Sequence, residues 1–253
     1  QDNFGNVVNS TAAVTIGSIT VNAVAGVASF PNIVITTSGN YTLTASASGF
    51  ANVTSNQFTI TPGSGSTMSF STQPPASATA GASFSAVVQI LDSNGNVATG
   101  SSAQVTIGST TVNAVAGVAT FSSLSLTTAG TYTLTATSSG LANAISTPIT
   151  INPAAAKKLA FTIQPVSGTA GEALTPAPAI QDNYGNTVNS SASVKIGSTT
   201  VSAVAGVATF PNVVFTTTGN YTLTATSTGL TNAVSNQFTI SAGSGSKLVF
   251  TTQ

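Results

Sequence analysis

A carboxylate and several amides recur together on short segments, and this arrangement comes nearest to offering a chemical site. The carboxylates are Asp2, Asp92 and Asp182, which stand 90 residues apart in sequences of the type Asp-x-x-Gly-Asn. A carboxylate with neighbouring amides could contribute to a calcium site. The alternative is a hairpin turn, in which Asp accepts backbone N–H bonds and Gly adopts a positive φ. We favour the turn, because calcium normally recruits several carboxylates, and keep the three Asp residues as weak calcium candidates.

Two lysines stand where an unusual covalent bond could form. Lys158 and Lys247 precede apolar alternating segments, the position of the Lys in the Lys–Asn isopeptide bonds of some pilin-like sandwiches. That chemistry also needs a nearby buried acid, for which the third repeat offers Glu172 and Asp182. We favour a solvated Lys at a strand edge, where a charge discourages aggregation.

Two polar patterns have both a functional and a structural interpretation. Alternating threonines such as Thr133, Thr135 and Thr137 resemble part of an ice-binding face, but a twisted sandwich should present one such strand per domain, so we expect an ordinary polar face. Asn-x-Ser/Thr sequons are frequent in a chain this rich in Asn, Ser and Thr, and carry glycans only if the producing cell glycosylates them. The sequons begin at Asn9, Asn40, Asn52, Asn189 and Asn220.

The composition excludes many classes of protein. Of 253 residues, four are Lys, three are Asp and one is Glu, and there is no Arg, His, Cys or Trp. Without His or Cys there is no usual zinc or haem ligand set, no Cys nucleophile and no Ser-His-Asp triad. Four Lys cannot form a basic surface for nucleic acid, and so few acids offer no paired-carboxylate glycosidase site. We therefore expect no enzyme, no catalytic residue, no cofactor and no bound nucleic acid.

No membrane span or signal peptide is evident in this segment. The longest apolar stretches are far shorter than a transmembrane helix. The chain also does not open with a basic segment followed by an apolar one. The high apolar content nevertheless argues against a disordered chain.

Internal repetition is the strongest pattern in the sequence. Val-Ala-Gly-Val-Ala-Ser/Thr-Phe ends at Phe30, Phe121 and Phe210, and Gly-x-Tyr-Thr-Leu-Thr-Ala surrounds Tyr41, Tyr132 and Tyr221. A period near 90 residues suits one small domain per repeat. Within a repeat, apolar and Thr residues alternate, and turn residues recur every 8–12 positions; examples of expected strands are 85–91, 104–107, 132–137 and 147–151. This profile predicts an all-β chain of antiparallel sandwiches with about seven strands each, in Greek-key order.

The expected core is aliphatic and aromatic, with a tyrosine corner. Tyr132 and Tyr221 stand two residues before a core Leu, as in immunoglobulin-type sandwiches, so we expect them to be mostly buried with the hydroxyl bonded to upstream backbone. Leu43, Leu134 and Leu223 take the place of the usual Cys. The remaining core pairs expected in the second and third repeats are Phe70/Phe161, Val105/Val194, Ile107/Ile196, Val118/Val207, Phe121/Phe210 and Ile149/Phe238.

The order of motifs resembles a known family. Lys-Leu-x-Phe-Thr-x-Gln-Pro is followed by Ala-Gly, Gln-Asp-x-x-Gly-Asn, Gly-Val-Ala-Thr-Phe and Gly-x-Tyr-Thr-Leu-Thr-Ala. This order is similar to that of the bacterial immunoglobulin-like tandem repeats of large surface and secreted proteins. The resemblance covers nearly the whole chain and implies a tandem array of sandwiches, most often used as a spacer.

The strand pattern divides the chain into repeats joined by seven-residue linkers. The expected boundaries are 1–60, 68–151 and 159–240, with 247–253 as the first strand of a further repeat. The first repeat lacks a counterpart of 68–90 and thus its first two strands. We expect preceding residues or a neighbouring chain to supply them, and the segment 247–253 has a suitable pattern to act as a strand donor.

Three functions remain open, all extracellular or at the cell surface. The first is a non-enzymatic, adhesin-type stalk, and the second is a self-associating filament, possibly joined by strand donation. A carbohydrate-binding module is disfavoured, because the loops offer few aromatic residues beyond Phe4 and Tyr184. The expected partners are adjacent repeats or copies of the same chain, since a net charge of zero provides little electrostatic repulsion.

Overall fold

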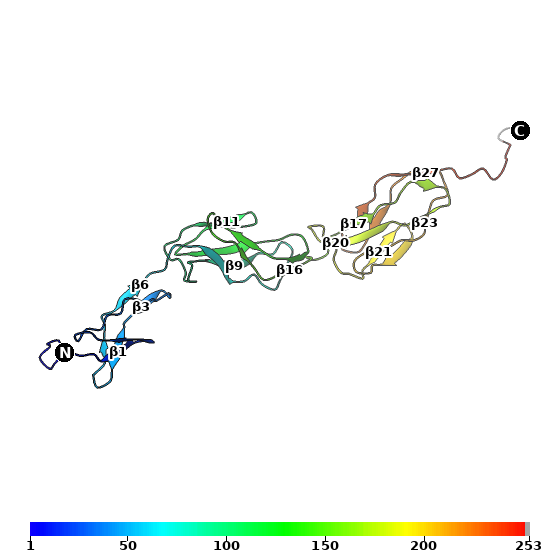
Figure 1. Cartoon of the computed structure of the whole chain (residues 1–253). Coiled ribbons are helices and arrows are strands. Elements are labelled where there is room, and N and C mark those ends of the chain that lie inside the picture. Colours follow the sequence, from blue (N-terminus) through cyan, green and yellow to red (C-terminus); the bar gives the residue numbers. More distant parts are fainter. Residues whose placement is uncertain (251–253) are drawn as a thin grey trace. The chain divides into compact units, whose positions relative to one another are not determined.

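The computed structural model describes residues 1–250 and consists of β-strands without helices in that range (Figure 1). The prediction of an all-β chain is confirmed; most strand pairs are antiparallel, but the second and third repeats each contain one sheet with a parallel pair. The described chain forms two compact units, each considered by itself below. One contains Gln1–Gln73, Ala86–Phe121 and Leu134–Ser146, and the other contains Pro74–Ser85, Ser122–Thr133 and the residues from Thr147 onward.

The strands of the first repeat form one four-stranded sheet, in the order β2-β1-β4-β5, and one pair, β3-β6. Their bounds are β1 (Ala13–Ile16), β2 (Ile19–Asn22), β3 (Gly39–Tyr41), β4 (Thr44–Ala47), β5 (Val53–Thr54) and β6 (Phe58–Ile60).

The strands of the middle repeat form the sheets β11-β10-β14-β15, β12-β9-β7 and β13-β16-β8. Their bounds are β7 (Thr67–Thr72), β8 (Ser77–Thr79), β9 (Phe84–Leu91), β10 (Gln104–Ile107), β11 (Thr110–Asn113), β12 (Val118–Leu124), β13 (Gly130–Tyr132), β14 (Thr135–Thr137), β15 (Ala144–Ile145) and β16 (Ile149–Asn152).

The third repeat has the sheets β22-β21-β25-β26, β18-β27-β24, β17-β20 and β19-β23. The bounds are β17 (Lys158–Ile163), β18 (Gly168–Thr169), β19 (Ala173–Leu174), β20 (Ala177–Gln181), β21 (Ser193–Ile196), β22 (Thr199–Ser202), β23 (Val213–Val214), β24 (Gly219–Tyr221), β25 (Thr224–Thr226), β26 (Ala233–Val234) and β27 (Phe238–Ser241). Residues 247–250 of the expected further strand are exposed and form no strand, while 251–253 lie outside the described residues.

The four-stranded sheet has the same strand order in all three repeats, and its first hairpin forms in the same way in each. Gly17, Gly108 and Gly197 begin two-residue turns with φ of 59°, 57° and 58°. Glycine in the first turn position is what a type II′ hairpin requires. The flanking strands then pair in one register, with Val14 opposite Val21, Val105 opposite Val112 and Val194 opposite Val201.

The core of the third repeat lies between this sheet and the remaining strands. Val194 and Ile196 of the four-stranded sheet pack in one buried cluster with Leu159 of β17, Ile180 of β20 and Phe238 of β27. Phe215 adds an aromatic contact, with ring centroids 4.4 Å from Tyr221 and 5.4 Å from Phe238. Two layers around an apolar interior make this repeat a β-sandwich.

Several expected core residues are only partly buried. Val118 and Val207 are half-exposed, whereas Ala119 and Ala208 are fully buried. Successive strand residues point to opposite faces, so Ala119 shares its face with Phe121 and Val118 cannot. Phe161 is also half-exposed, and a register irregularity follows it in β17.

The expected strand through Tyr132 is divided into β13 and β14, and its counterpart through Tyr221 into β24 and β25. The chain leaves one sheet at Tyr221 and enters another at Thr224. A buried serine stabilises this step, because the Ser235 Oγ accepts the Leu223 N–H at 2.9 Å and donates to the Asn236 carbonyl at 2.8 Å. Ser55 and Ser146 accept the N–H of Leu43 and Leu134 in the same way.

Replacing Ser235 with alanine is therefore expected to lower the free energy of unfolding of the third repeat by about 1–3 kcal/mol, because the Leu223 N–H loses a buried acceptor. Hydrogen exchange of peptides from 159–240 would measure the loss. Ser198→Ala, at an exposed hairpin tip, is the control and should change exchange very little. Equal effects of the two substitutions would refute the role of Ser235.

Candidate functional site

The three Asp-x-x-Gly-Asn segments form closed turns. Asp92 N–H donates to the Asn96 carbonyl at 2.8 Å, and Asp182 N–H donates to the Asn186 carbonyl at 2.9 Å. The central glycines have positive φ, 85° at Gly95. The Oδ1 atom of Asp92 accepts the N–H groups of residues 94 and 96 at 2.9 Å each. The carboxylate thus organises the turn from inside, as sequence reasoning expected of an Asp in the first position.

The second carboxylate oxygen binds the linker that precedes each repeat. Asp92 Oδ2 accepts the Gly63 N–H at 2.9 Å, and Asp182 Oδ2 accepts the Ala154 N–H at 2.9 Å. Both carboxylates are buried, at 3% and 0% exposure. Their oxygens are occupied by N–H groups, and no cluster of three or more His, Cys, Asp or Glu side chains occurs within residues 1–250. These contacts are those of a turn, and none of them favours a calcium site at Asp92 or Asp182.

The asparagine at the end of the turn bonds to the preceding repeat. In the first unit, Asn96 Nδ2 donates to the Thr36 carbonyl at 2.8 Å, and its Oδ1 accepts the Ser38 N–H at 2.9 Å. The same Nδ2 group also donates to Asp92, at 3.0 Å from Oδ2. The side-chain amide of Asn96 therefore binds both a C=O and an N–H of a loop in the preceding repeat. Its hydrogen bond to Asp92 fixes its orientation.

The second unit repeats this arrangement with different residues. Asn186 Nδ2 donates to the Thr127 carbonyl and its Oδ1 accepts the Ala129 N–H, both at 2.8 Å. Asn186 Nδ2 also lies 2.7 Å from Asp182 Oδ2. We call each set a clasp: the upstream clasp joins turn 92–96 to loop 36–38, and the downstream clasp joins turn 182–186 to loop 127–129.

The tyrosine corner forms a hydrogen bond with the same loop that the clasp asparagine binds. Tyr132 donates its hydroxyl hydrogen to the Thr128 carbonyl at 3.0 Å, and Tyr41 donates to the Thr37 carbonyl at 2.9 Å. These carbonyls lie between the two backbone groups that bind the asparagine. The predicted hydroxyl bond is confirmed, and Tyr221 makes it to Thr217 at 3.0 Å. Tyr132 and Tyr221 are also mostly buried, as predicted, and Tyr221 packs against the core cluster of the third repeat.

A ring contact accompanies the downstream clasp. Tyr184, inside the turn, lies so close to Gly81 that a Cβ at that position would collide with its hydroxyl. Phe4 is the corresponding residue of the first turn and is 91% exposed. In that turn, Asp2 still accepts the N–H groups of Phe4 and Asn6, and Asn6 Nδ2 bonds to Asp2 at 2.9 Å. Within residues 1–250, the first turn thus keeps its internal hydrogen bonds, but Asn6 does not bind a loop of another repeat.

The same hydrogen bonds lower the pKa of the carboxyls. The Asn96 side chain, followed by the Gly63 N–H, lowers the pKa of Asp92 to about 2. At Asp182 burial opposes ionisation, but the bonds from Asn186 and Ala154 outweigh it and the pKa is lowered. The pKa of Asp2 is lowered chiefly by the Asn6 side chain, and that of Glu172 by the Thr169 N–H.

Stability is consequently expected to fall only in acid. A carboxyl with a lowered folded-state pKa stabilises the fold above its unfolded pKa, near 4 for Asp, and the contribution disappears as pH falls toward the folded value of about 2 at Asp92. With no His in the sequence, the melting temperature should be nearly constant between roughly pH 5 and 8. Thermal unfolding from pH 2 to 8 tests this, and a steep change near pH 6–7 would contradict it.

The side chains considered for an isopeptide bond and for glycosylation lie in ordinary structural positions. Glu172 Oε2 accepts the Thr169 N–H at 2.8 Å, and Lys158 lies opposite Gln181 in the β17–β20 pair. Both acids considered for an isopeptide bond thus already accept backbone N–H groups. The five sequon asparagines are exposed.

A short row of threonines crosses the four-stranded sheet of the middle repeat, with one Thr from each of three strands. Thr106 lies opposite Thr111 on one side and Thr137 on the other, which gives a row across three strands. Ser46 and Lys195 take places in the corresponding rows of the first and third repeats, so the row is not uniform. The mixture suits a polar outer face with high β-propensity better than a regular Thr array.

Comparisons with known proteins add likenesses of low identity. No protein-family model and no curated protein matches the chain. Among solved structures, the Escherichia coli adhesin FdeC is 16% identical, with 81% of this chain and 74% of that chain covered and a TM-score of 0.37. Yersinia pseudotuberculosis InvD is 22% identical, with 74% and 60% covered and a TM-score of 0.34. A Bacteroides vulgatus β-glycosidase is 13% identical at a TM-score of 0.33, with 68% of this chain covered but only 24% of the glycosidase. No helix within residues 1–250 is long and apolar enough to cross a membrane.

Proposed function

We propose that this chain is a non-enzymatic structural segment of a tandem-repeat stalk, of adhesin type, outside the cell or at its surface. The observation that carries the proposal is the clasp, which two junctions build from the same Asn side-chain and loop backbone groups with nearly the same bond lengths. A segment with a mechanical role needs contacts that hold neighbouring repeats together. In the clasp, the Asp-x-x-Gly-Asn motif provides such contacts. The motif order adds support, because it resembles that of bacterial surface repeats.

The chemistry of the clasp suits a spacer better than a binding site. The turn's carboxylate and amide are occupied by backbone groups of the same chain, so they offer little to a ligand. Each amide–backbone bond contributes about 0.5–1.5 kcal/mol. Two such bonds restrain a junction without making it irreversible. An array built in this way would restrict motion at each junction while retaining some compliance.

The location can be tested on intact producing cells. Antibodies raised against the chain should label unpermeabilised cells or their secreted material, and externally added protease should remove the signal. Cytoplasmic marker proteins are the control and should stay protected. Labelling that appears only after permeabilisation would contradict an extracellular stalk.

A further inference from the structure

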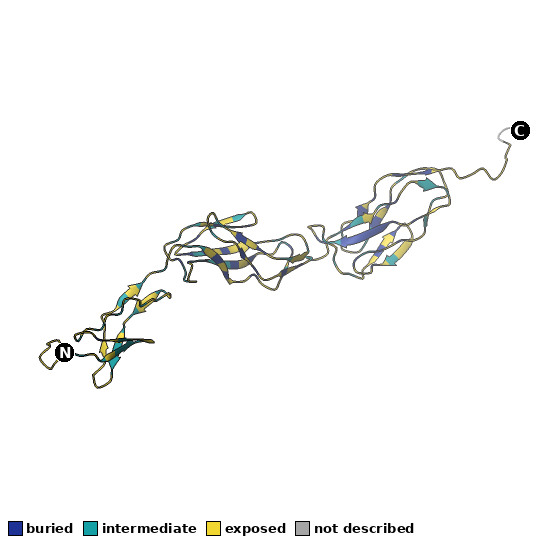
Figure 2. Ribbon diagram, in the orientation of Figure 1, coloured by how far each residue is buried: buried dark blue, intermediate teal, exposed yellow. Residues whose placement is uncertain are grey.

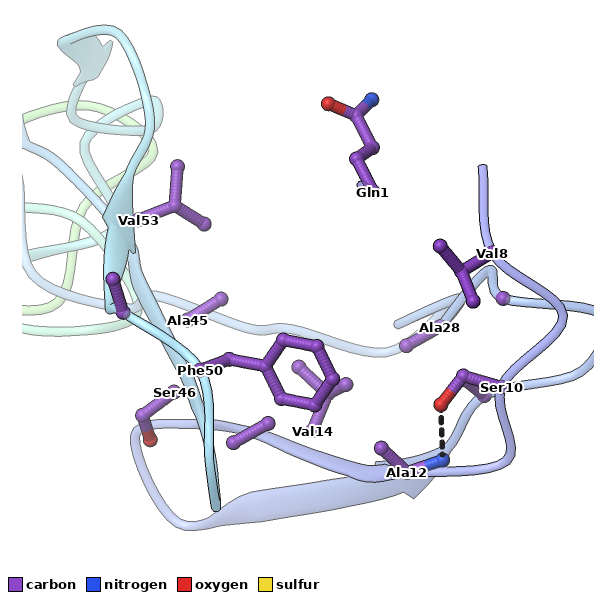
Figure 3. A pocket seen from close by; sticks show the side chains of 14 residues that line it. Gln1, Val8, Ser10, Ala12, Val14, Ala28, Ala45, Ser46, Phe50 and Val53 are labelled. Atoms are coloured by element: carbon purple, nitrogen blue, oxygen red, sulfur yellow. Dashed lines mark hydrogen bonds between the residues drawn. The ribbon is translucent and has the colours of Figure 1, made fainter. Parts of the chain in front are cut away.

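Few side chains of this chain can react spontaneously. Figure 2 shows buried residues, in dark blue, on strands such as β9, and exposed residues, in yellow, along the loops. The hollow of about 360 Å³ in the first repeat is lined mostly by apolar side chains, and its Ser10 hydroxyl already accepts the Ala12 N–H at 3.1 Å (Figure 3). Since the sequence has no Cys or His, the reactive groups to consider are the exposed side-chain amides.

One asparagine differs from all the others in the residue that follows it. Asn94, in the turn 92–96, precedes Gly95, and this is the only Asn-Gly pair in the 253 residues. The backbone nitrogen of the next residue can attack an asparagine side chain, and a glycine leaves that nitrogen unshielded because it has no Cβ. The first and third turns carry Phe4 and Tyr184 in place of Asn94, so they lack the reacting amide.

The turn presents the Asn-Gly pair to solvent. Asn94 is exposed, and within residues 1–250 its side-chain amide has no hydrogen-bond partner. Gly95 is exposed as well, and no atom lies within 4 Å of a Cβ built on it, which leaves space for a ring beside the backbone. Neither group has to leave a packed environment before the two can meet.

One hydrogen bond restrains the reacting nitrogen. The Gly95 N–H donates to the Asp92 carbonyl at 3.2 Å, a longer distance than the 2.8 Å between the Asp92 nitrogen and the Asn96 carbonyl oxygen. The Gly95 nitrogen must lose this partner before it attacks, so local opening of the turn should limit the rate. The reaction should therefore be slower in the folded chain than in the unfolded chain, but faster at Asn94 than at any other asparagine.

We propose that Asn94 deamidates spontaneously through a cyclic imide. The Gly95 nitrogen gives its proton to hydroxide and attacks Cγ of Asn94. A bond forms between these two atoms, and the Cγ–Nδ2 bond breaks as Nδ2 leaves with the electron pair and is protonated to ammonia. Water then opens the ring at either carbonyl carbon, which gives an ordinary aspartate or an isoaspartate whose backbone continues through Cγ. One water is consumed and one ammonia released, with no oxidation or reduction.

The isoaspartate form would disrupt the upstream clasp. It adds one atom to the backbone of a turn that the bond from Asp92 N–H to the Asn96 carbonyl closes, and it adds a negative charge two residues from the buried Asp92 carboxylate. Both changes displace Asn96, whose amide binds the Thr36 carbonyl and the Ser38 N–H. The downstream clasp has no Asn-Gly pair and should stay unchanged. This consequence rests on the proposed function of the clasp, whereas the deamidation does not.

The first test follows deamidation of the folded chain during incubation at mildly alkaline pH. Peptide mass spectrometry, with an isoaspartate methyltransferase to count the isoaspartate form, should show conversion at Asn94 several-fold faster than at Asn9 and Asn189, which precede serine. Asn94→Ser should abolish this conversion. Phe4→Asn, at a position 91% exposed, places the same pair in the first turn and should create a second site. Conversion at Asn94 no faster than at Asn9 or Asn189, or no second site in the Phe4→Asn chain, would overturn the proposal.

The second test measures the effect on the junction by hydrogen exchange. Chain that has formed isoaspartate should exchange the Ser38 N–H several-fold faster than fresh chain, while the loop 127–129 stays unchanged. Asn94→Ser incubated in the same way is the control for other damage, and Asn94→Asp separates the added charge from the added backbone atom. A Ser38 N–H that stays protected in the isoaspartate form would show that the modification does not release the clasp. Fast exchange at Ser38 already in fresh chain would overturn both this consequence and the clasp on which the proposed function rests.

Discussion

Replacing Asp182 with alanine is expected to lower the free energy of unfolding of the third repeat by about 3 kcal/mol, because buried donors lose their acceptor. The carboxylate accepts four bonds: from the N–H groups of Ala154, Tyr184 and Asn186, and from the Asn186 amide. Hydrogen exchange of peptides from the turn and the 153–158 linker would register the loss first.

Asp2→Ala is the matched control for this substitution. It changes the same motif, but Asp2 is exposed and its bonds stay within its own turn. The control should have a much smaller effect and should leave exchange in the third repeat unchanged. If Asp182→Ala proved as mild as the control, the carboxylate would not organise the junction.

Replacing Gly117 with alanine is expected to destabilise the middle repeat by about 3–4 kcal/mol. The added Cβ would lie 2.6 Å from the Ala98 carbonyl oxygen, and φ at this position is +78°. The backbone of Gly117 cannot shift freely, because its N–H donates to Ser101 and its carbonyl accepts the Ile90 N–H. Strain and collision therefore add together.

Gly108→Ala separates these two contributions. Gly108 also has a positive φ, +57°, but no atom lies within 4 Å of the added Cβ. Its cost should be smaller, about 1–3 kcal/mol, the backbone strain of an L-residue at the first position of a type II′ turn without any collision. Chemical denaturation followed by hydrogen exchange compares the two variants, and equal losses would show that the approach of Ala98 is unimportant.

The sequence contained enough to predict the sheets but not the junctions. Period-two alternation predicted the strand 104–107 at its observed bounds, because hairpin turns and strand propensity are local properties. The placement of Val118 in the core failed because residues 118 and 121 cannot share a strand face. The division of the Tyr132 strand depends on which sheet each half joins, a property of the tertiary fold that alternation does not encode.

The clasp was missed because its partners are distant in sequence. The turn accounted for Asp92 and Gly95 but gave no reason for an Asn at position 96, and the bonded loop lies 60 residues away at Thr36. The available signal was that all three turns end in Asn while all three Thr-Thr loops precede a tyrosine corner. Such a signal shows that both segments matter, but a structure is needed to show that they meet.

Whether the asparagine amide holds neighbouring repeats together can be measured as the distribution of distances across the downstream clasp. Spin labels on cysteines introduced at Ser123 and Ser198, both exposed, would report the distribution of distances between the middle and third repeats. The unsubstituted background should give one narrow distribution, and Asn186→Ala should broaden it because two bonds to the loop are lost. Asn183→Ala, at an exposed position of the same turn, should leave it narrow. Distributions of the same width with Asn186 and with alanine would contradict the claim that the clasp restrains the junction.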